Sequence, residues 1–220
     1  MSSRLIYNIR QLVGTRAETH LLRGAELAGL PCIDNAWLHI EDDHIAAFGP
    51  MSGLPEVWGR QLGSDGPIDA SGCLVLPAWC DSHTHLVFAG SRESEFVDKL
   101  KGLSYADINA KGGGILNSAR KLAATSEDTL FNDAWRRLND LARLGTGAIE
   151  IKSGYGLTVE DELKMLRVIQ KLKQRSGLAI KATFLGAHTY PAAYRDDHPG
   201  YIDLIINELL PVIARDGLAD

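Results

Sequence analysis

From residue 73 onward the chain alternates nearly continuous apolar runs with long amphipathic patterns, and this alternation constrains the fold most. The apolar runs cover residues 73–81, 147–151 and 178–185. Strands of this kind are buried on both faces, which is typical of a parallel sheet covered by helices. Helical patterns cover residues 125–145 and 158–177, and a further one begins near residue 199. The sequence therefore predicts an α/β fold built from repeated strand–helix units.

Two of these helices carry start and stop signals. Thr125 is followed by Asp128, and Thr158 is followed by Asp161, which is the spacing of a capping box. Gly145 stands at the end of the first pattern, where a helix commonly terminates. We expect Leu130, Ala134, Leu138 and Leu141 to line the buried face of the first helix, Leu163, Leu166, Ile169 and Leu172 that of the second, and Ile202, Ile205, Ile206 and Leu209 that of the last.

Repeated strand–helix units form either a doubly wound sheet or a β/α barrel. No GxGxxG follows a strand, and the glycine run at residues 112–114 follows no strand pattern, so we interpret it as a loop rather than a phosphate site. A barrel is the better prediction. Residues 73–220 leave about 150 residues for it, whereas a complete barrel takes about 250. We therefore expect an incomplete TIM barrel in a chain truncated at its C-terminus.

Residues 1–72 have a different pattern. Short segments at 4–8, 36–40 and 44–48 alternate in part between apolar and polar residues, and turn-forming residues separate them. The acidic stretch at 41–44 predicts a hairpin loop, and residues 63–67 predict a turn before a returning strand. We interpret residues 1–72 as a small β-sandwich-like domain.

Composition narrows the class of partner. The chain has 23 Lys and Arg against 28 Asp and Glu, and this acidic balance predicts neither a nucleic-acid nor a membrane partner. No apolar run approaches the roughly 20 residues of a membrane span, and no signal peptide is recognisable. Three cysteines, Cys32, Cys73 and Cys80, lack CxxC spacing and predict buried, reduced thiols. We expect a cytoplasmic protein that acts on a small molecule.

The strongest candidate site is His83-Thr84-His85, at the end of the first apolar run. Residues two apart on a strand face the same side, so both imidazoles can approach one point. In a β/α barrel the carboxyl ends of the strands form the active face. The spacing and position together indicate a metal site, although His-x-His pairs also arise by chance.

Three further side chains lie where this active face is expected. Arg92 follows the first strand and is suited to bind a carboxylate, or it is a solvated surface arginine. Tyr155 stands between two glycines, which leaves its phenol exposed. His188 follows the third strand and is a metal ligand, a substrate contact or a buried structural histidine. Lys152 either is the lysine that some metal-dependent hydrolases convert to a bridging carbamate, a role that the order of the strands argues against, or pairs with Glu150.

The sequence PAWCDSHTH after a small β domain resembles the amidohydrolase superfamily, in which this HxH binds a catalytic metal. The motifs AGSRESEF, KGGGIL, EIKSGYGL and FLGAHTYP, in this order, make the chain similar to the imidazolonepropionase family. The resemblance implies that His83 and His85 bind one zinc or iron ion. It also implies that Arg92, Tyr155 and His188 contact 4-imidazolone-5-propanoate, with Arg92 at its propanoate. The implied reaction opens the ring to N-formimidoyl-L-glutamate in histidine degradation, and a homodimer is expected.

The family pattern also includes a further metal histidine, an acidic substrate contact and a metal-binding aspartate on later barrel strands, and this chain lacks them. We therefore assign no proton-handling catalytic residue within the 220 residues. Two histidines fall short of the three protein ligands usual in catalytic zinc sites, so we expect this chain alone to bind metal weakly and to be nearly inactive.

Two alternatives stay open. The first is another amidohydrolase, such as a nucleobase deaminase, whose neutral substrate would have no carboxylate for Arg92. The second is a non-catalytic half-barrel that a partner chain completes.

Overall fold

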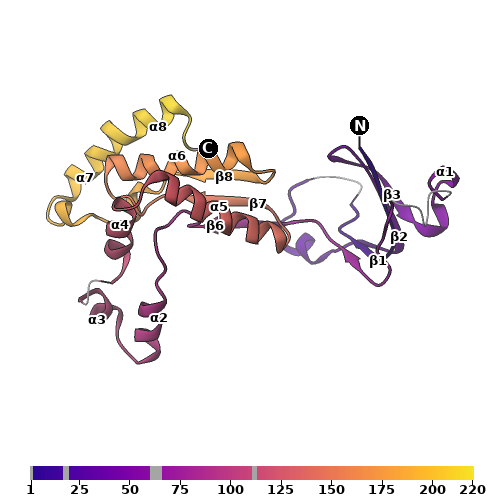
Figure 1. The fold of residues 1–220 in the computed structure, drawn as a ribbon, viewed down its shortest axis with the longest axis horizontal. Coiled ribbons are helices and arrows are strands. Elements are labelled where there is room, and N and C mark those ends of the chain that lie inside the picture. The colour runs from indigo at the N-terminus through magenta and orange to yellow at the C-terminus, as the bar shows by residue number, and fades with distance from the viewer. Residues whose placement is uncertain (1, 17–19, 60–65, 111–112) are drawn as a thin grey trace. The chain divides into compact units, whose positions relative to one another are not determined.

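The computed structural model describes residues 2–16, 20–59, 66–110 and 113–220 (Figure 1). The chain forms two compact units, Met1–Pro77 and Ala78–Asp220. Most of the predicted turn at residues 63–67 and part of the glycine run at residues 112–114 lie outside the described residues.

The first unit is built on a five-stranded sheet with the order β3-β2-β1-β4, in which β5 also pairs with β1. Its strands are β1 (Ser3–Val13), β2 (Cys32–Glu41), β3 (His44–Pro50), β4 (Ile68–Asp69) and β5 (Leu74–Val75), joined by short helical turns at Gly24–Ala28, Met51–Gly53 and α1 (Glu56–Gly59). β2 and β3 form the predicted hairpin, with Asp42 at its turn in the left-handed region (φ 54). The strands β1 and β2 contribute Ile9, Leu12, Ala36 and Leu38 to a small core, which Ala70 completes. The described residues show this one sheet, so the sandwich stays a prediction.

The second unit contains a three-stranded parallel sheet with the order β6-β7-β8. The strands are β6 (Trp79–Thr84), β7 (Thr146–Lys152) and β8 (Ala179–Thr183). The long helices α5 (Glu127–Arg143) and α6 (Val159–Arg175) connect them. The predicted α/β class is confirmed, and the sheet is open among the described residues.

The second unit contains five further helices among the described residues. They are α2 (Glu93–Leu100), α3 (Tyr105–Ala110), α4 (Ile115–Ala123), α7 (His198–Leu204) and α8 (Leu210–Asp216), with short turns at Gly186–His188 and Ala192–Tyr194 and a π-helical turn at Ile205–Leu209. Figure 1 shows α2 and α3 standing away from the sheet. No described helix is both long and apolar enough to cross a bilayer.

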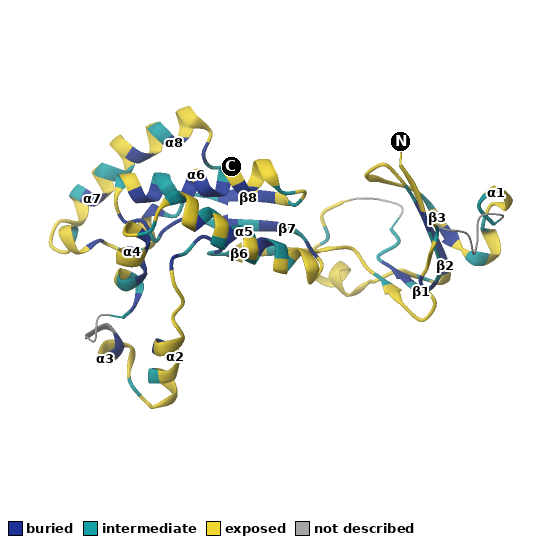
Figure 2. Ribbon diagram, viewed as in Figure 1, coloured by how far each residue is buried: buried dark blue, intermediate teal, exposed yellow. Residues whose placement is uncertain are grey.

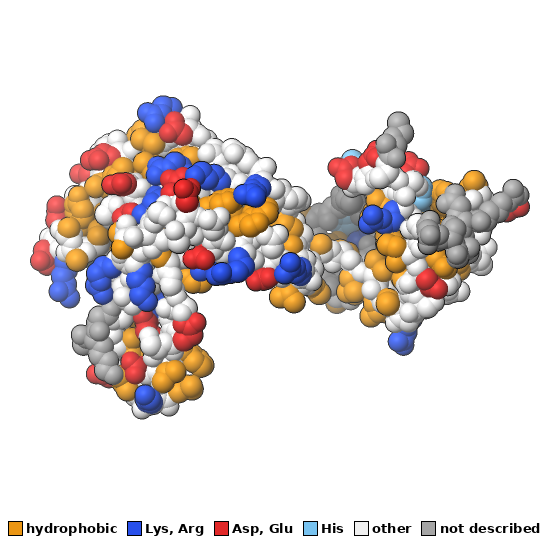
Figure 3. Space-filling view, viewed as in Figure 1, with side chains coloured by type: hydrophobic (Ala, Val, Ile, Leu, Met, Phe, Trp, Pro, Cys, Tyr) orange, Lys and Arg blue, Asp and Glu red, His pale blue; other side chains and the backbone are white. Residues whose placement is uncertain are grey.

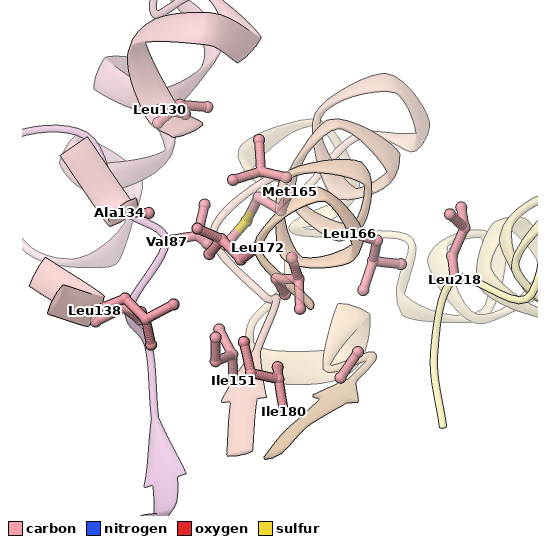
Figure 4. Packing of buried hydrophobic residues seen from close by; sticks show 14 of the residues in the cluster. Val87, Leu130, Ala134, Leu138, Ile151, Met165, Leu166, Leu172, Ile180 and Leu218 are labelled. Carbon is pink, nitrogen blue, oxygen red and sulfur yellow. The ribbon is translucent and has the colours of Figure 1, made fainter. Parts of the chain in front are cut away.

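The core of the second unit lies between the sheet and the two long helices (Figures 2 and 4). Ile149 and Ile151 of β7 point toward the helices and are at most 2% exposed. Leu130, Ala134 and Leu138 of α5 and Leu166, Ile169 and Leu172 of α6 are also buried, as predicted from their helical spacing. The opposite face of β7 carries Glu150 and Lys152, so polar side chains are presented on the side away from the helices.

The prediction of one strand over residues 73–81 was wrong. Leu74–Val75 pairs with β1 in the first unit, whereas Trp79–Thr84 begins the parallel sheet of the second unit. Pro77 lies between the two segments and cannot donate a ladder hydrogen bond, which accounts for the break.

Two helix predictions also need correction. The N-cap of α5 is Ser126, whose side chain accepts the Thr129 N–H, while the Thr125 hydroxyl donates to the Lys121 carbonyl of the preceding helix. At the end of the chain Ile202 and Ile206 are exposed although Leu209 is buried. The π-helical turn at Ile205–Leu209 changes the helical period there and so rotates the buried face. The Thr158 N-cap of α6 is confirmed.

The prediction of buried cysteines was wrong as well. Cys32, Cys73 and Cys80 are free and exposed. Cys32 begins a strand, Cys73 lies in the connection before β5, and Cys80 lies on β6, an edge strand of its sheet. A cysteine that has apolar neighbours in the sequence is therefore not necessarily buried in the fold.

Candidate active site

The two histidines of the HxH motif lie at the carboxyl end of β6. His83 is within the strand and His85 follows its last residue, and their ring centroids are 5.8 Å apart. Between them, Thr84 donates its hydroxyl hydrogen to the Glu150 carbonyl oxygen at 2.7 Å, which ties this end of β6 to β7. Strand pairing thus holds the motif at the edge where the carboxyl ends of the parallel strands meet.

His85 has ring neighbours from both other strands of the sheet. The ring of Tyr155, which follows β7, stacks at 4.8 Å, and the ring of His188, which follows β8, lies at 5.1 Å. Burial, together with the nearby His188, His83 and Lys152, lowers the pKa of His85. The imidazole is therefore neutral at physiological pH, which is the form that binds metal ions.

Arg92 is the N-cap residue of α2 and is held by a carboxylate one turn further along. Its Nε donates to Glu95 Oε2 at 2.8 Å, and a second guanidinium nitrogen contacts the same oxygen. The other oxygen of Glu95 accepts the Gly114 N–H at 3.1 Å, so the pair also anchors the start of α4. The hydrogen bond from Arg92 lowers the pKa of Glu95, and Glu95 raises the pKa of Arg92. Both groups stay charged near neutral pH.

Arg92, Tyr155 and His85 line one cavity of about 470 Å³. Burial raises the pKa of Tyr155, so its phenol is protonated and can donate a hydrogen bond. The remaining lining residues are Phe88, Gly90, Ser91, Glu93, Phe96 and Ser118. Figure 3 shows hydrophobic side chains gathered on the α2–α3 segment, and Phe96 of α2, which lines the cavity, is 62% exposed. A cavity with apolar walls and a few polar groups is typical of a small-molecule site.

A charged pair lies beside the histidines. Lys152 pairs with Glu150, which was one of its two possible roles, and the same Glu150 oxygen accepts the Thr183 hydroxyl. Burial raises the pKa of the Glu150 carboxyl, but the hydrogen bonds from Lys152 and Thr183 outweigh it and leave the pKa below its usual value.

The structure thus brings four of the five candidates together as one ring cluster: His83, His85, Tyr155 and His188. Arg92 joins His85 and Tyr155 through the shared cavity. In the part of the chain that the structure describes, no group of three or more His, Cys, Asp or Glu side chains is arranged to hold a metal ion.

Sequence reasoning missed two buried glutamates, Glu95 and Glu162, that organise the loops of the site. Glu95 could have been predicted from the sequence, because it follows Arg92 by three residues, which is the spacing of an ion pair on one helix. Glu162 has no such local signal, because its partners lie in the preceding loop.

No protein-family model matches the chain. Among solved structures, guanine deaminase from Escherichia coli superposes with a TM-score of 0.54 at 12% identity, covering 94% of this chain and 42% of the deaminase. A triazine hydrolase variant superposes with a TM-score of 0.53 at 13% identity, covering 98% of this chain and 51% of the hydrolase. The chain therefore shares the fold of these two enzymes over the aligned part.

Among curated proteins, imidazolonepropionases match nearly the whole chain. The imidazolonepropionase of Flavobacterium johnsoniae is 56% identical over 217 residues, which are 98% of this chain and 52% of that enzyme. That of Christiangramia forsetii is 52% identical over the same shares, and that of Shewanella woodyi is 44% identical over 86% of this chain and 45% of the enzyme. The chain is related to the imidazolonepropionases over nearly all its residues, and it spans about half the length of these curated relatives.

Proposed function

We propose that this chain forms part of an imidazolonepropionase, which hydrolyses 4-imidazolone-5-propanoate to N-formimidoyl-L-glutamate. The observation that carries the proposal is the 56% identity to such an enzyme over 98% of the chain. The shared cavity of Arg92, Tyr155 and His85 supports it, because a cation and a phenol suit a small, polar, carboxylate-bearing ring. The sheet β6-β7-β8 is proposed as the beginning of a β/α barrel, with the first unit, Met1–Pro77, as part of a separate small domain.

His83 and His85 would hold one zinc or iron ion, and imidazole suits both metals. The fit is supported by His85 itself, because its Nδ1 is buried and has no hydrogen-bond partner among the described residues. When bound, such an ion polarises a carbonyl group and lowers the pKa of a coordinated water to about 7. The third protein ligand usual in catalytic zinc sites is not assigned within this chain.

Arg92 would bind the propanoate group of the substrate. Its guanidinium is charged, is already oriented by Glu95 and lines the cavity, so it can donate two parallel hydrogen bonds to a carboxylate. Tyr155 would donate a hydrogen bond to the ring. His188, whose ring lies 5.9 Å from that of Tyr155, would orient the imidazolone or stabilise the negative charge that develops on its carbonyl oxygen. The homodimer and the cytoplasmic location stay predictions.

The test uses the protein as its source organism makes it, assayed for consumption of 4-imidazolone-5-propanoate and formation of N-formimidoyl-L-glutamate. We expect Arg92→Ala to raise KM by about 10- to 100-fold with a smaller change in kcat, because a charge-assisted contact to the bound carboxylate is lost. Arg136→Ala removes an exposed arginine of α5 and serves as the control. Ammonia release from a nucleobase without turnover of the imidazolone, or an unchanged KM in Arg92→Ala, would contradict the proposal.

A further inference from the structure

Glu162 is a fully buried carboxylate surrounded by backbone N–H groups. It lies in the first turns of α6 and has no exposed surface. One of its oxygens accepts the N–H of Gly156 at 2.7 Å and of Leu157 at 3.3 Å, and both oxygens accept the N–H of Gly154, at 3.0 and 3.1 Å. Among the described residues no lysine or arginine forms an ion pair with it. Backbone N–H groups therefore take the place of the water molecules and of the counter-ion that a carboxylate usually has.

Packing alone does not explain why a glutamate occupies this buried position. A buried carboxylate loses its hydration, and an apolar side chain of similar volume fills a core position at lower cost. The hydrogen bonds of Glu162 all go to one segment, residues 153–157, which we name the tyrosine loop. The carboxylate thus acts as a common acceptor around which this loop is wound.

The tyrosine loop has a backbone that needs such an anchor. Leu157 lies in the left-handed region at φ 61, which is unfavourable for a leucine, and Gly154 lies at φ +108. A Cβ at Gly156 would come within 2.3 Å of the backbone nitrogen of Glu162, so the loop lies directly against the start of α6. Without an acceptor at this point, nothing else described would hold the N–H groups of Gly154, Gly156 and Leu157 inward.

The opposite side of the tyrosine loop contacts the segment that carries His188. A Cβ at Gly154 would lie 2.8 Å from the Leu185 carbonyl oxygen and 3.0 Å from the Cβ of His188. Ser153 accepts the Leu185 N–H at 3.0 Å. The loop is therefore held between α6 and the end of β8, and Tyr155, between its two glycines, has its ring 4.8 Å from His85.

We propose that Glu162 is a positioning residue that fixes Tyr155 in the cavity against His85 and His188. The assignment of a substrate contact to Tyr155 rests on the proposed function, whereas the anchoring of the tyrosine loop does not. Glu162 touches no reacting atom and acts through the loop.

The first experiment measures hydrogen exchange of the backbone amides in the 220-residue chain. In the wild type, the amides of Gly154, Gly156 and Leu157 are expected to exchange as slowly as those of β7. Glu162→Gln keeps the shape of the side chain but replaces one of the two oxygens that accept from Gly154 by an NH2 group, which is a donor. The oxygen that remains is neutral and is a weaker acceptor, so exchange of these amides should become at least about tenfold faster. Glu160→Gln removes an exposed glutamate from the same helical turn and should leave exchange unchanged. Fast loop exchange in the wild type, or slow exchange in Glu162→Gln, overturns the proposal.

The second experiment tests whether the effect passes through Tyr155, with the protein as its source makes it. Glu162→Gln should raise KM for 4-imidazolone-5-propanoate by about tenfold, and the same change in a Tyr155→Phe background should raise it much less. Equal effects in both backgrounds would show that Glu162 does not act through Tyr155. The wild-type exchange result tests the loop even where Glu162→Gln fails to fold. Absence of imidazolone turnover in the wild type contradicts the proposed function and leaves the exchange result standing.

Discussion

The Glu95 carboxylate orients the Arg92 guanidinium for ligand binding. The Glu95 carboxylate is 11% exposed and engages one edge of a guanidinium that is 41% exposed. The pair is therefore partly buried. The Arg92 guanidinium lines the cavity, and the Glu95 carboxylate accepts a hydrogen bond from the Gly114 N–H. An arginine oriented in this way loses less conformational entropy when it binds a carboxylate.

The Arg92–Glu95 pair predicts a pH dependence of stability. Because the folded pKa of Glu95 is lowered from 4.5, its stabilising contribution is complete above that value and is lost as the pH falls through the folded pKa. Glu95→Gln should therefore lower the melting temperature at neutral pH, and the difference from wild type should shrink in acid. Thermal unfolding from neutral to acidic pH tests this, with Glu93→Gln as the control. A difference that stays constant with pH would contradict the prediction.

Asp220 makes a second, stronger carboxylate contact. It accepts hydrogen bonds from Lys173 of α6 at 2.7 Å and from the Ala182 N–H of β8 at 2.8 Å. These bonds lower its pKa from 3.8 to about 2. Its stabilising contribution is thus complete above about pH 4 and is lost as the pH falls through about 2.

Asp220→Asn should lower the free energy of unfolding by about 1 to 2 kcal/mol at neutral pH. Urea unfolding at neutral pH measures the difference, and a repeat at about pH 2.5 should show it reduced. Asp216→Asn, which alters an exposed pair with the adjacent Arg215, should have little effect. Equal effects of the two changes at neutral pH would count against the contact.

Among the secondary-structure elements, those with long regular patterns followed the sequence and those with interruptions did not. The spacing of apolar residues predicted α5 and α6 and their buried faces because each helix packs one stripe against the sheet. Pro77 and the π-helical turn at Ile205–Leu209 altered pairing and period locally. A periodic pattern contains no information on where such an interruption falls.

The tyrosine loop provides a prediction at this scale. A Cβ at Gly156 would lie 2.3 Å from the Glu162 backbone nitrogen, and neither backbone can yield without breaking the loop. Gly156→Ala should destabilise the protein by about 3 kcal/mol. Gly177→Ala, where a Cβ would meet nothing within 4 Å, should change stability by no more than about 0.5 kcal/mol. Chemical denaturation of both variants measures these changes in the free energy of unfolding. A mild effect of Gly156→Ala would show that the loop is not tightly packed on α6.

For the molecule as a whole, the described residues present an open sheet with the histidine cluster at one end. Catalytic zinc sites usually have three protein ligands, and no such group occurs in the described ranges. The 220-residue chain should therefore bind zinc weakly, with less than one ion per chain after dialysis, and His83→Ala together with His85→Ala should abolish what remains. Metal analysis after dialysis tests this. One tightly held ion per chain would show that a third ligand exists that we have not assigned.

By itself the sequence determined the α/β class, the long helices, the position of the HxH motif and the resemblance to imidazolonepropionases. These depend on local periodicity and on short motifs, which are properties of neighbouring residues. The tertiary structure decided which charged groups are buried, that Glu95 holds Arg92, that Glu162 anchors the tyrosine loop, and that the three cysteines are exposed. Burial and hydrogen-bond partners depend on which elements pack together, and no local pattern contains that information.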